Sequence, residues 1–120
     1  MKPIAERLCR EAAQGDSDMQ FRYGLCLHRG LGVGQDLTKA LNYYELAAAQ
    51  GNASAQFNAG VCFEQGLGVG LDLKKALKYY ELAAAQGDAK AQCNAGACFA
   101  QGLGVGQDLT KALKYFELAA

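Results

Sequence analysis

An internal repeat constrains this chain more than any other feature of its sequence. The stretch Gln65–Ala76, QGLGVGLDLKKA, has counterparts at Arg29–Ala40 and Gln101–Ala112, each displaced by 36 residues. A glycine-rich string that recurs at a fixed interval between two apolar stretches is typical of the corner of a helical repeat. The period therefore predicts an array of similar units stacked side by side.

The alignment of the chain with itself divides it into one half unit and three units. Residues 1–15 align with 37–51, so we interpret them as a diverged half repeat that forms an amino-terminal cap. The units follow at 16–51, 52–87 and 88–120, and the last ends inside its second helix. The second and third units differ at only eight of their 33 shared positions, which indicates internal duplication.

Each unit has the pattern of two helices joined by the glycine-rich string. In the second unit, Ala55, Ala59, Cys62 and Phe63 share one helical face, which predicts a first helix over about 53–65. We expect Gly66 to end this helix in a left-handed conformation, and Gly68 and Gly70 to permit a sharp turn.

The second helix is predicted to begin after Asp72, its N-cap, and to end at Gly87. Its apolar stripe consists of Leu73, Ala76, Leu77, Tyr80, Ala83 and Ala84. We expect Tyr79 and Tyr80 to add bulk and to reach backbone partners with their hydroxyl groups. Asp16, Asn52 and Asp88 are the predicted N-caps of the first helices. A helix pair of this kind has no interior of its own, so the units must stack, and about three are needed for stability.

The second unit, AQFNAGVCFEQGLGVGLDLKKALKYYELAAAQGDA, resembles the Sel1-like repeat, an α/α unit related to the tetratricopeptide repeat. The matching elements are Ala55, Gln56, Gly60, Phe63, Gly66, Gly68, Val69, Asp72, Lys75, Ala76, Tyr80, Ala83, Ala84, Gln86 and Gly87. The resemblance implies an all-α fold, a right-handed superhelical solenoid of about three 36-residue helix-turn-helix repeats. It also implies an adaptor or scaffold role in signalling or protein quality control, and it transfers no catalytic residue.

Two departures from the family pattern stand out. The family usually has Leu where this chain has Ala59 and Ala95, and Tyr23 occupies that place in the first unit. What fills the lost volume stays open at this point. Bacterial cysteine-rich members similar to this repeat pair a cysteine on each helix, whereas the second helices here carry none after Cys9.

The five cysteines do not suggest disulfides. Cys26, Cys62 and Cys98 are one position seen three times, and equivalent atoms of stacked helices lie about 8–10 Å apart. That separation exceeds the ~7 Å between Cα atoms that a bridge allows. We therefore expect reduced thiols that act as small apolar residues, in a reducing compartment.

Composition and charge exclude several function classes. Twelve Lys and Arg balance twelve Asp and Glu, so no overall field attracts nucleic acid or an anionic membrane. The amino terminus is too charged for a secretory signal, and no stretch approaches the ~20 apolar residues of a membrane span. We expect a cytoplasmic protein with no nucleic-acid or membrane partner.

The sequence contains no motif for catalysis, metal binding or cofactor binding. The GLGVG strings lack the Gly-Lys-Ser/Thr of a P-loop and the preceding strand of a dinucleotide site, so they are interpreted as turns. His28 is the only histidine, and Cys93 and Cys98 point about 140° apart on one helix. We expect no enzymatic activity, no cofactor and no metal. Lys74, Lys75 and Lys78 are interpreted as a solvated outer face.

A comparison of the units with one another predicts a binding surface on the first helices. Six positions on the side facing away from the packed stripe differ between the three units, whereas the second helix differs at three positions only. Exposed residues also drift without selection, which is the alternative explanation. First helices line the concave side of helical solenoids, the usual recognition surface. The predicted partner-binding residues are Asp18, Phe21, Arg22, Leu25, His28, Arg29, Ser54, Phe57, Asn58, Val61, Glu64, Gln65, Lys90, Asn94 and Gln101.

The sequence thus favours an interaction module that holds a peptide or helix of a partner protein on its concave face. The alternative is a regulatory repeat segment of a larger enzyme or of a ubiquitin-ligase or quality-control assembly. Leu113 and Phe116 in the last helix have no following repeat to cover them. We therefore expect either that the chain continues or that this helix mediates self-association.

Overall fold

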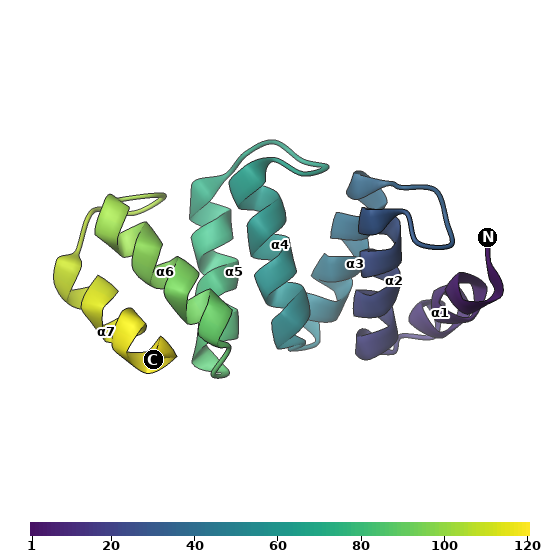
Figure 1. The fold of residues 1–120 in the computed structure, drawn as a ribbon, viewed down its shortest axis with the longest axis horizontal. Helices are drawn as coiled ribbons and strands as arrows, with labels where there is room; N and C mark the ends of the chain where they lie inside the picture. The colour runs from purple at the N-terminus through teal and green to yellow at the C-terminus, as the bar shows by residue number, and fades with distance from the viewer.

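The computed structural model describes all 120 residues, and it contains seven α-helices and no strand. Successive helices pack as antiparallel neighbours along an elongated molecule of 48 × 26 × 20 Å (Figure 1). This arrangement confirms the predicted α/α solenoid. The helices are α1 (Pro3–Ala13), α2 (Ser17–Arg29), α3 (Leu37–Ala49), α4 (Ala53–Gln65), α5 (Leu73–Ala85), α6 (Ala89–Gln101) and α7 (Leu109–Ala119).

Every helix after α1 begins at a side-chain cap. The Asn52 side chain accepts a hydrogen bond from the Ala55 backbone N–H at 2.9 Å, and Asp72 accepts from that of Lys75 at 3.1 Å. These bonds satisfy N–H groups that have no partner within the helix. The predicted caps are confirmed, and the complete set is Asp16, Asp36, Asn52, Asp72, Asp88 and Asp108.

The three glycines of each string have different roles. Gly66 ends α4 in the left-handed conformation at φ 69°, as predicted. Gly68, at φ 72°, packs against the start of α3, where an added Cβ would lie 2.5 Å from the Leu37 carbonyl. Gly70 has neither a positive φ nor a neighbour within 4 Å of such a Cβ. We expected both Gly68 and Gly70 to permit the sharp turn, but a Cβ at Gly70 would meet no clash, so of the two only Gly68 has that role.

Contact between repeats is what Gly68 provides. Its carbonyl accepts a hydrogen bond from the Thr38 hydroxyl at 3.3 Å, across 30 residues of sequence. Gly104 meets Leu73 in the same way one unit later, and Gly32 meets Lys2 in the amino-terminal cap. The glycine-rich string is thus a hinge within one unit and a docking point on the unit before it.

The main apolar core runs through the whole stack, from Leu8 in α1 to Ala112 in α7, and two small alanine clusters lie beside it. Its largest members are tyrosines, and two of them, Tyr44 and Tyr80 of the second helices, are completely buried. Each ring lies against a glycine of the first helix. A Cβ on Gly60 would come within 2.7 Å of the Tyr80 ring, so Gly60 is required for this helix pair to close.

The structure also answers where the volume lost at Ala59 goes. Phe63, one turn later on α4, stacks on Tyr79 with ring centroids 5.9 Å apart. In the first unit the sizes are exchanged, because Leu27 stands at the Phe63 position and Tyr23 packs edge-on against Tyr43. A large ring therefore fills this space in every unit, from one of two positions a helical turn apart.

Buried glutamines connect consecutive units. Gln56 at the start of α4 donates to the Ala48 carbonyl at 3.2 Å and accepts from the Gln86 side chain at 2.9 Å. The Ala48 carbonyl belongs to the last turn of α3, where helical carbonyls lack partners within the helix. No buried side-chain nitrogen or oxygen is left without a hydrogen bond.

All five cysteines are unpaired. Cys62 and Cys98 are buried as expected, whereas Cys26 is only half-buried and Cys93 is exposed. Burial, together with the Glu45 carboxylate, raises the pKa of the Cys62 thiol to about 11. Cys62 therefore behaves as a small apolar residue at neutral pH.

None of the seven helices combines the length and the apolar character needed to cross a membrane.

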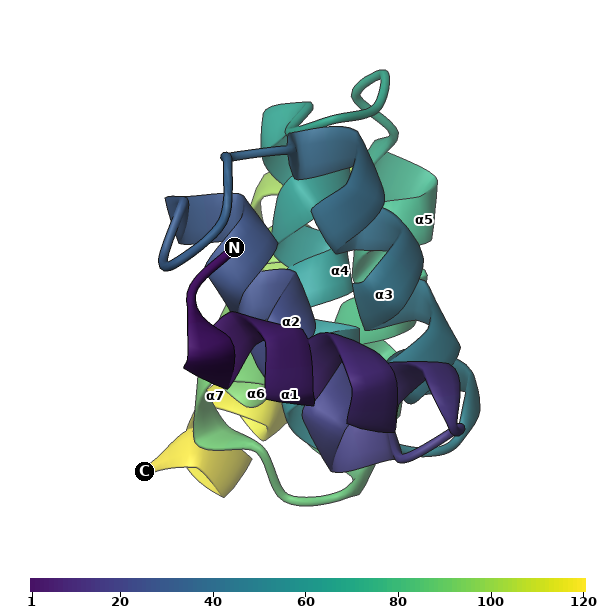
Figure 2. The same cartoon turned by 90° about the vertical axis from the view of Figure 1, so that its right-hand side faces the viewer.

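Seen along the long axis, α3 and α5 lie on one side of the stack and α2 on the other (Figure 2).

Replacing Gly68 with Ala tests the contact between units. The new Cβ must occupy a left-handed backbone position and collides with the Leu37 carbonyl. We expect a loss of about 2 kcal/mol or more in the free energy of unfolding. Gly70→Ala is the matched control, expected to be neutral or to stabilise by about 0.4–1 kcal/mol through the unfolded state. Urea denaturation measures both, and equal losses would contradict the assignment of separate roles.

Candidate functional site

All fifteen residues predicted to bind a partner lie on the three first helices. Six are on α2, six on α4 and three on α6, and each is exposed or half-buried. We call this set the first-helix face. The apolar members Phe21, Leu25, Phe57 and Val61 pack partly against the core, so their positions are fixed by the fold.

A hollow of about 180 Å³ joins the three repeats on the first-helix face. Seven of its eight lining residues were predicted from the sequence, and the eighth is Asp88, the N-cap of α6. The remaining predicted residues lie outside this hollow. The lining residues are Phe21, Leu25, Arg29, Ser54, Phe57, Asn58, Asp88 and Lys90.

Some charged side chains on this face form ion pairs or hydrogen bonds, and others do not. Arg22 and Asp18 form an ion pair along α2 at 3.1 Å, with both side chains largely exposed. Arg29 forms no ion pair, and the Lys90 ammonium lies 6.0 Å from the centroid of the Phe57 ring. Asp88 already accepts the Ala91 N–H of its own helix at 2.9 Å. The hollow therefore offers two cations, from α2 and α6, beside apolar rings.

Tyrosines of the second helices form part of the floor beneath this face. The Tyr44 hydroxyl lies 3.1 Å from Nδ1 of His28, and the Tyr80 hydroxyl donates to the Glu64 carboxylate at 2.6 Å. Each phenol also meets an asparagine of the next unit, Asn58 for Tyr44 and Asn94 for Tyr80. Two residues of the predicted face, His28 and Glu64, are thus hydrogen-bonded to two buried rings, and Asn58 and Asn94 lie near enough to affect the pKa of those rings.

The third unit lacks both halves of this contact. Ala100 replaces the position of His28 and Glu64, and Phe116 replaces the position of Tyr44 and Tyr80. The hydroxyl and its partner therefore disappear together, as expected if each requires the other. Sequence reasoning identified both varying positions but did not pair them. The signal was available, because both positions lose their polar group in the same unit, at Ala100 and Phe116.

The buried phenols resist ionisation. Burial raises the pKa of Tyr44 to about 12, and the Asn58 amide offsets part of the rise. The pKa of Tyr80 is also raised, first by burial and then by the Glu64 carboxylate that accepts a hydrogen bond from its hydroxyl. Both rings are neutral hydrogen-bonding groups throughout the physiological pH range.

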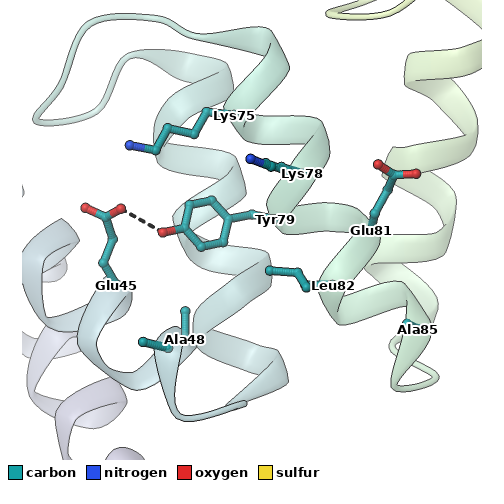
Figure 3. Close-up of a pocket in the computed structure, with 9 residues that line it drawn as sticks. Glu45, Ala48, Lys75, Lys78, Tyr79, Glu81, Leu82 and Ala85 are labelled. Carbon is teal, nitrogen blue, oxygen red and sulfur yellow. Dashed lines mark hydrogen bonds between the residues drawn. The ribbon is translucent and has the colours of Figure 1, made fainter.

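A larger hollow, of about 690 Å³, lies between α3 and α5 (Figure 3). We call it the second-helix groove. In its centre the Tyr79 hydroxyl donates to the Glu45 carboxylate at 2.7 Å. The tyrosine hydroxyls were predicted to reach backbone groups, and this is wrong for both Tyr79 and Tyr80. The lining residues are Glu45, Ala48, Ala49, Lys75, Lys78, Tyr79, Glu81, Leu82 and Ala85.

The lysines of α5 are more than a solvated outer face. Lys75 and Lys78 line the second-helix groove, and the Lys75 ammonium lies 4.7 Å from the centroid of the Phe63 ring. Lys111 lies over Phe99 in the same way in the next unit, at 4.8 Å. Sequence reasoning missed this groove because its walls come from two units that the linear pattern treats separately.

No three His, Cys, Asp or Glu side chains are arranged so that they could hold a metal ion. The two hollows offer apolar surface, hydrogen-bonding groups and separate charges.

A sequence model of the Sel1 repeat matches residues 17–52, 53–88 and 89–120. The chain belongs to the Sel1 repeat family. A comparison with curated protein sequences gives no match.

Solved Sel1-type structures superimpose closely. A protective antigen of uropathogenic Escherichia coli with an SLR fold is 33% identical, with a TM-score of 0.92 over 96% of this chain and 25% of its own. A Sel1 repeat protein from Oxalobacter formigenes is 36% identical, with a TM-score of 0.88 over 90% of this chain and 44% of its own. This chain therefore spans less than half of either protein.

Helicobacter pylori cysteine rich protein B has a TM-score of 0.77 over 96% of this chain and 85% of its own. Its identity of 23% establishes a shared fold alone. Sel1 repeats are in general protein-interaction modules and typically serve as scaffolds without catalytic activity. That general role is the starting point for a function of this chain.

Alkaline titration tests the burial of Tyr44. Its pKa rises from 10.0 in the unfolded chain to about 12 in the fold, so the stabilisation is complete below pH 10. It is lost as the pH rises from 10 to about 12, because the unfolded chain ionises first. In the Tyr44→Phe variant, the free energy of unfolding should therefore fall less steeply with rising pH over that interval than in the parent protein. Identical slopes for the variant and the parent protein in urea denaturation would contradict this.

A double-mutant cycle tests the pairing of Glu64 with Tyr80. Glu64→Ala removes the acceptor of a buried hydroxyl, which should destabilise by about 1–3 kcal/mol. Tyr80→Phe should cost about 1 kcal/mol, because half-buried Glu64 can turn toward water. The double variant recreates the Ala100 and Phe116 pair of the third unit and should cost less than the sum. Additive losses in thermal unfolding would show that the two positions are independent.

Proposed function

We propose that this Sel1 repeat array is an adaptor module that binds a peptide or helical segment of a partner protein on its first-helix face. The observation that carries the proposal is the hollow of about 180 Å³. Residues from three repeats line it, and all eight of them stand at positions that differ from unit to unit. A surface assembled from several repeats suits an elongated ligand that crosses them.

The chemistry of the hollow supports binding of a protein segment over binding of a small molecule. Its volume is below the roughly 300–1,000 Å³ of small-molecule sites, and it accommodates single side chains of a docked segment. Phe21 and Phe57 offer apolar contact, while Asn58 and Ser54 offer hydrogen bonds. Arg29 and Lys90 favour a segment that carries a carboxylate.

The rigidity of the floor supports the same proposal. The Phe57 ring packs against the Tyr80 ring with centroids 5.8 Å apart, and the Phe21 ring packs against the Tyr44 ring with centroids 6.0 Å apart. Because both tyrosines are completely buried, the exposed edges of Phe21 and Phe57 are held in place before any ligand arrives. Side chains held in place in this way lose little conformational entropy on binding.

Substitution on the two faces tests the proposal. A partner is identified by affinity capture and mass spectrometry, and its affinity is then measured with purified proteins. Phe57→Ala and Asn58→Ala should each weaken binding about five- to tenfold or more, because apolar anchors and their polar neighbours at the centre of an interface contribute most. Lys39→Ala and Asn42→Ala, on exposed positions of α3, are the matched controls and should leave the affinity unchanged.

Thermal unfolding of each variant separates lost binding from lost folding. An unchanged affinity for the Phe57 and Asn58 variants, with a loss on replacing Lys74 and Lys78, would move the partner to the second helices and overturn the proposal.

A further inference from the structure

We propose that the second-helix groove is a second binding surface, and that it takes an amphipathic helix of a partner protein with acidic residues at one end. This surface is separate from the first-helix face, because its lining residues come from α3 and α5. A protein with both surfaces could connect two partners.

The groove has two chemically different ends (Figure 3). Lys75 and Lys78 stand in the amino-terminal half of α5, whereas Leu82 and Ala85 stand in its carboxyl-terminal half. Ala48 of α3 faces the apolar end from the opposite wall. The hydrogen-bonded pair of Tyr79 and Glu45 lies between the ends.

The basic end extends beyond the main hollow. A second depression of about 460 Å³ is lined by Asp72, Lys74, Lys75, Lys78 and Gly104. Lys75 and Lys78 line both depressions, so the two depressions adjoin at these side chains. Three ammonium groups therefore surround one end of a surface that is apolar at the other end.

The lysines lack carboxylate partners, whereas the carboxylates are already hydrogen-bonded. No ion pair involves Lys74, Lys75 or Lys78. By contrast, Asp72 accepts the Lys75 backbone N–H at 3.1 Å, and Glu45 accepts the Tyr79 hydroxyl at 2.7 Å. Glu81 accepts the Tyr115 hydroxyl of the next unit at 3.3 Å. An incoming Asp or Glu therefore meets unpaired cations.

The leucine at the apolar end is largely exposed to solvent. Leu82 is 51% exposed, and the equivalent Leu46 and Leu118 are 52% and 65% exposed. Each unit thus presents a leucine to solvent at the same place on its second helix. Covering the Leu82 side chain and the adjoining alanines removes apolar surface from water, which favours association.

The groove recurs once along the array. A hollow of about 310 Å³ between α5 and α7 is lined by Glu81, Ala84, Ala85, Lys111, Lys114, Tyr115 and Leu118. These residues are the 36-residue equivalents of Glu45, Ala48, Ala49, Lys75, Lys78, Tyr79 and Leu82. Between α1 and α3 the pattern is broken, because Cys9 takes the place of the glutamate and Asn42 that of the second lysine.

A helix is the occupant that matches this shape. Equivalent helices of consecutive units run in the same direction, and the ridges of a third helix can pack into the space between them. Helix α5 has 13 residues and is therefore about 20 Å long, which suits a partner helix of three to four turns. Apolar residues at i, i+3, i+4 and i+7 would face Leu82, and an acidic last or first turn would face the lysines.

Selection from a displayed library of 16-residue helices tests this proposal with a defined probe. The purified chain is the target, and each selected peptide is then titrated by fluorescence anisotropy. We expect peptides with helically spaced apolar residues and Asp or Glu at one end. Their affinity should fall about tenfold or more for Leu82→Ser and for the double variant Lys75→Glu, Lys78→Glu.

Two variants keep this result interpretable. Lys78→Asn copies the residue found naturally at Asn42, so it should fold normally and still weaken binding about two- to fivefold. Lys39→Glu changes the lysine equivalent to Lys75 outside the groove and should have no effect. Phe57→Ala, on the first-helix face, should also leave these peptides unaffected.

Four outcomes would overturn the proposal. The first is selected peptides without an acidic end, and the second is peptides whose affinity is insensitive to Leu82 and Lys78. The third is binding of phosphatidylglycerol vesicles through the same lysines with no peptide enriched. A loss of binding in the Phe57→Ala variant alone would assign the peptides to the first-helix face and would leave only the proposed adaptor function standing.

Discussion

The packing of one buried tyrosine against one glycine supports the rest of this structure. Tyr80 of α5 closes onto Gly60 of α4, and Tyr44 closes onto Gly24 in the unit before. The close approach brings the two helices of a unit together and buries the ring completely. Because the hydroxyl must still find a partner, the ring reaches residues beneath the first-helix face. Stability and the shape of the candidate binding surface therefore depend on the same contact.

This contact also connects neighbouring units. The Tyr80 hydroxyl meets Glu64 of its own unit and Asn94 of the next one, so a change in one repeat alters the surface of another. The glutamine bridges and the Gly68 docking point add further links between units. A repeat array is often treated as a chain of independent modules with nearest-neighbour terms. Here polar side chains contribute to those terms beside the apolar core.

The two faces of the array differ in how they combine variation and charge. The first-helix face varies between units, and it gathers Arg29 and Lys90 around one small hollow. The second-helix groove is nearly the same in two successive units and is divided into a basic end and an apolar end. A varied surface suits one specific segment, whereas a repeated surface suits equivalent segments. Together they fit the general scaffold role of Sel1 repeats.

The amino-acid sequence alone predicts the helices, their caps, their left-handed ends and the residues on each face, because these follow from a short period repeated three times. Which residues meet across units is known only from the fold in three dimensions. The ring at Phe63 that replaces the volume lost at Ala59, the pairing of Tyr80 with Glu64 and the groove between α3 and α5 all depend on distances between helices. Helical periodicity fixes the direction of a side chain around its own axis. It does not fix how closely the next helix approaches, and here that distance is set by whether a glycine leaves room for a tyrosine.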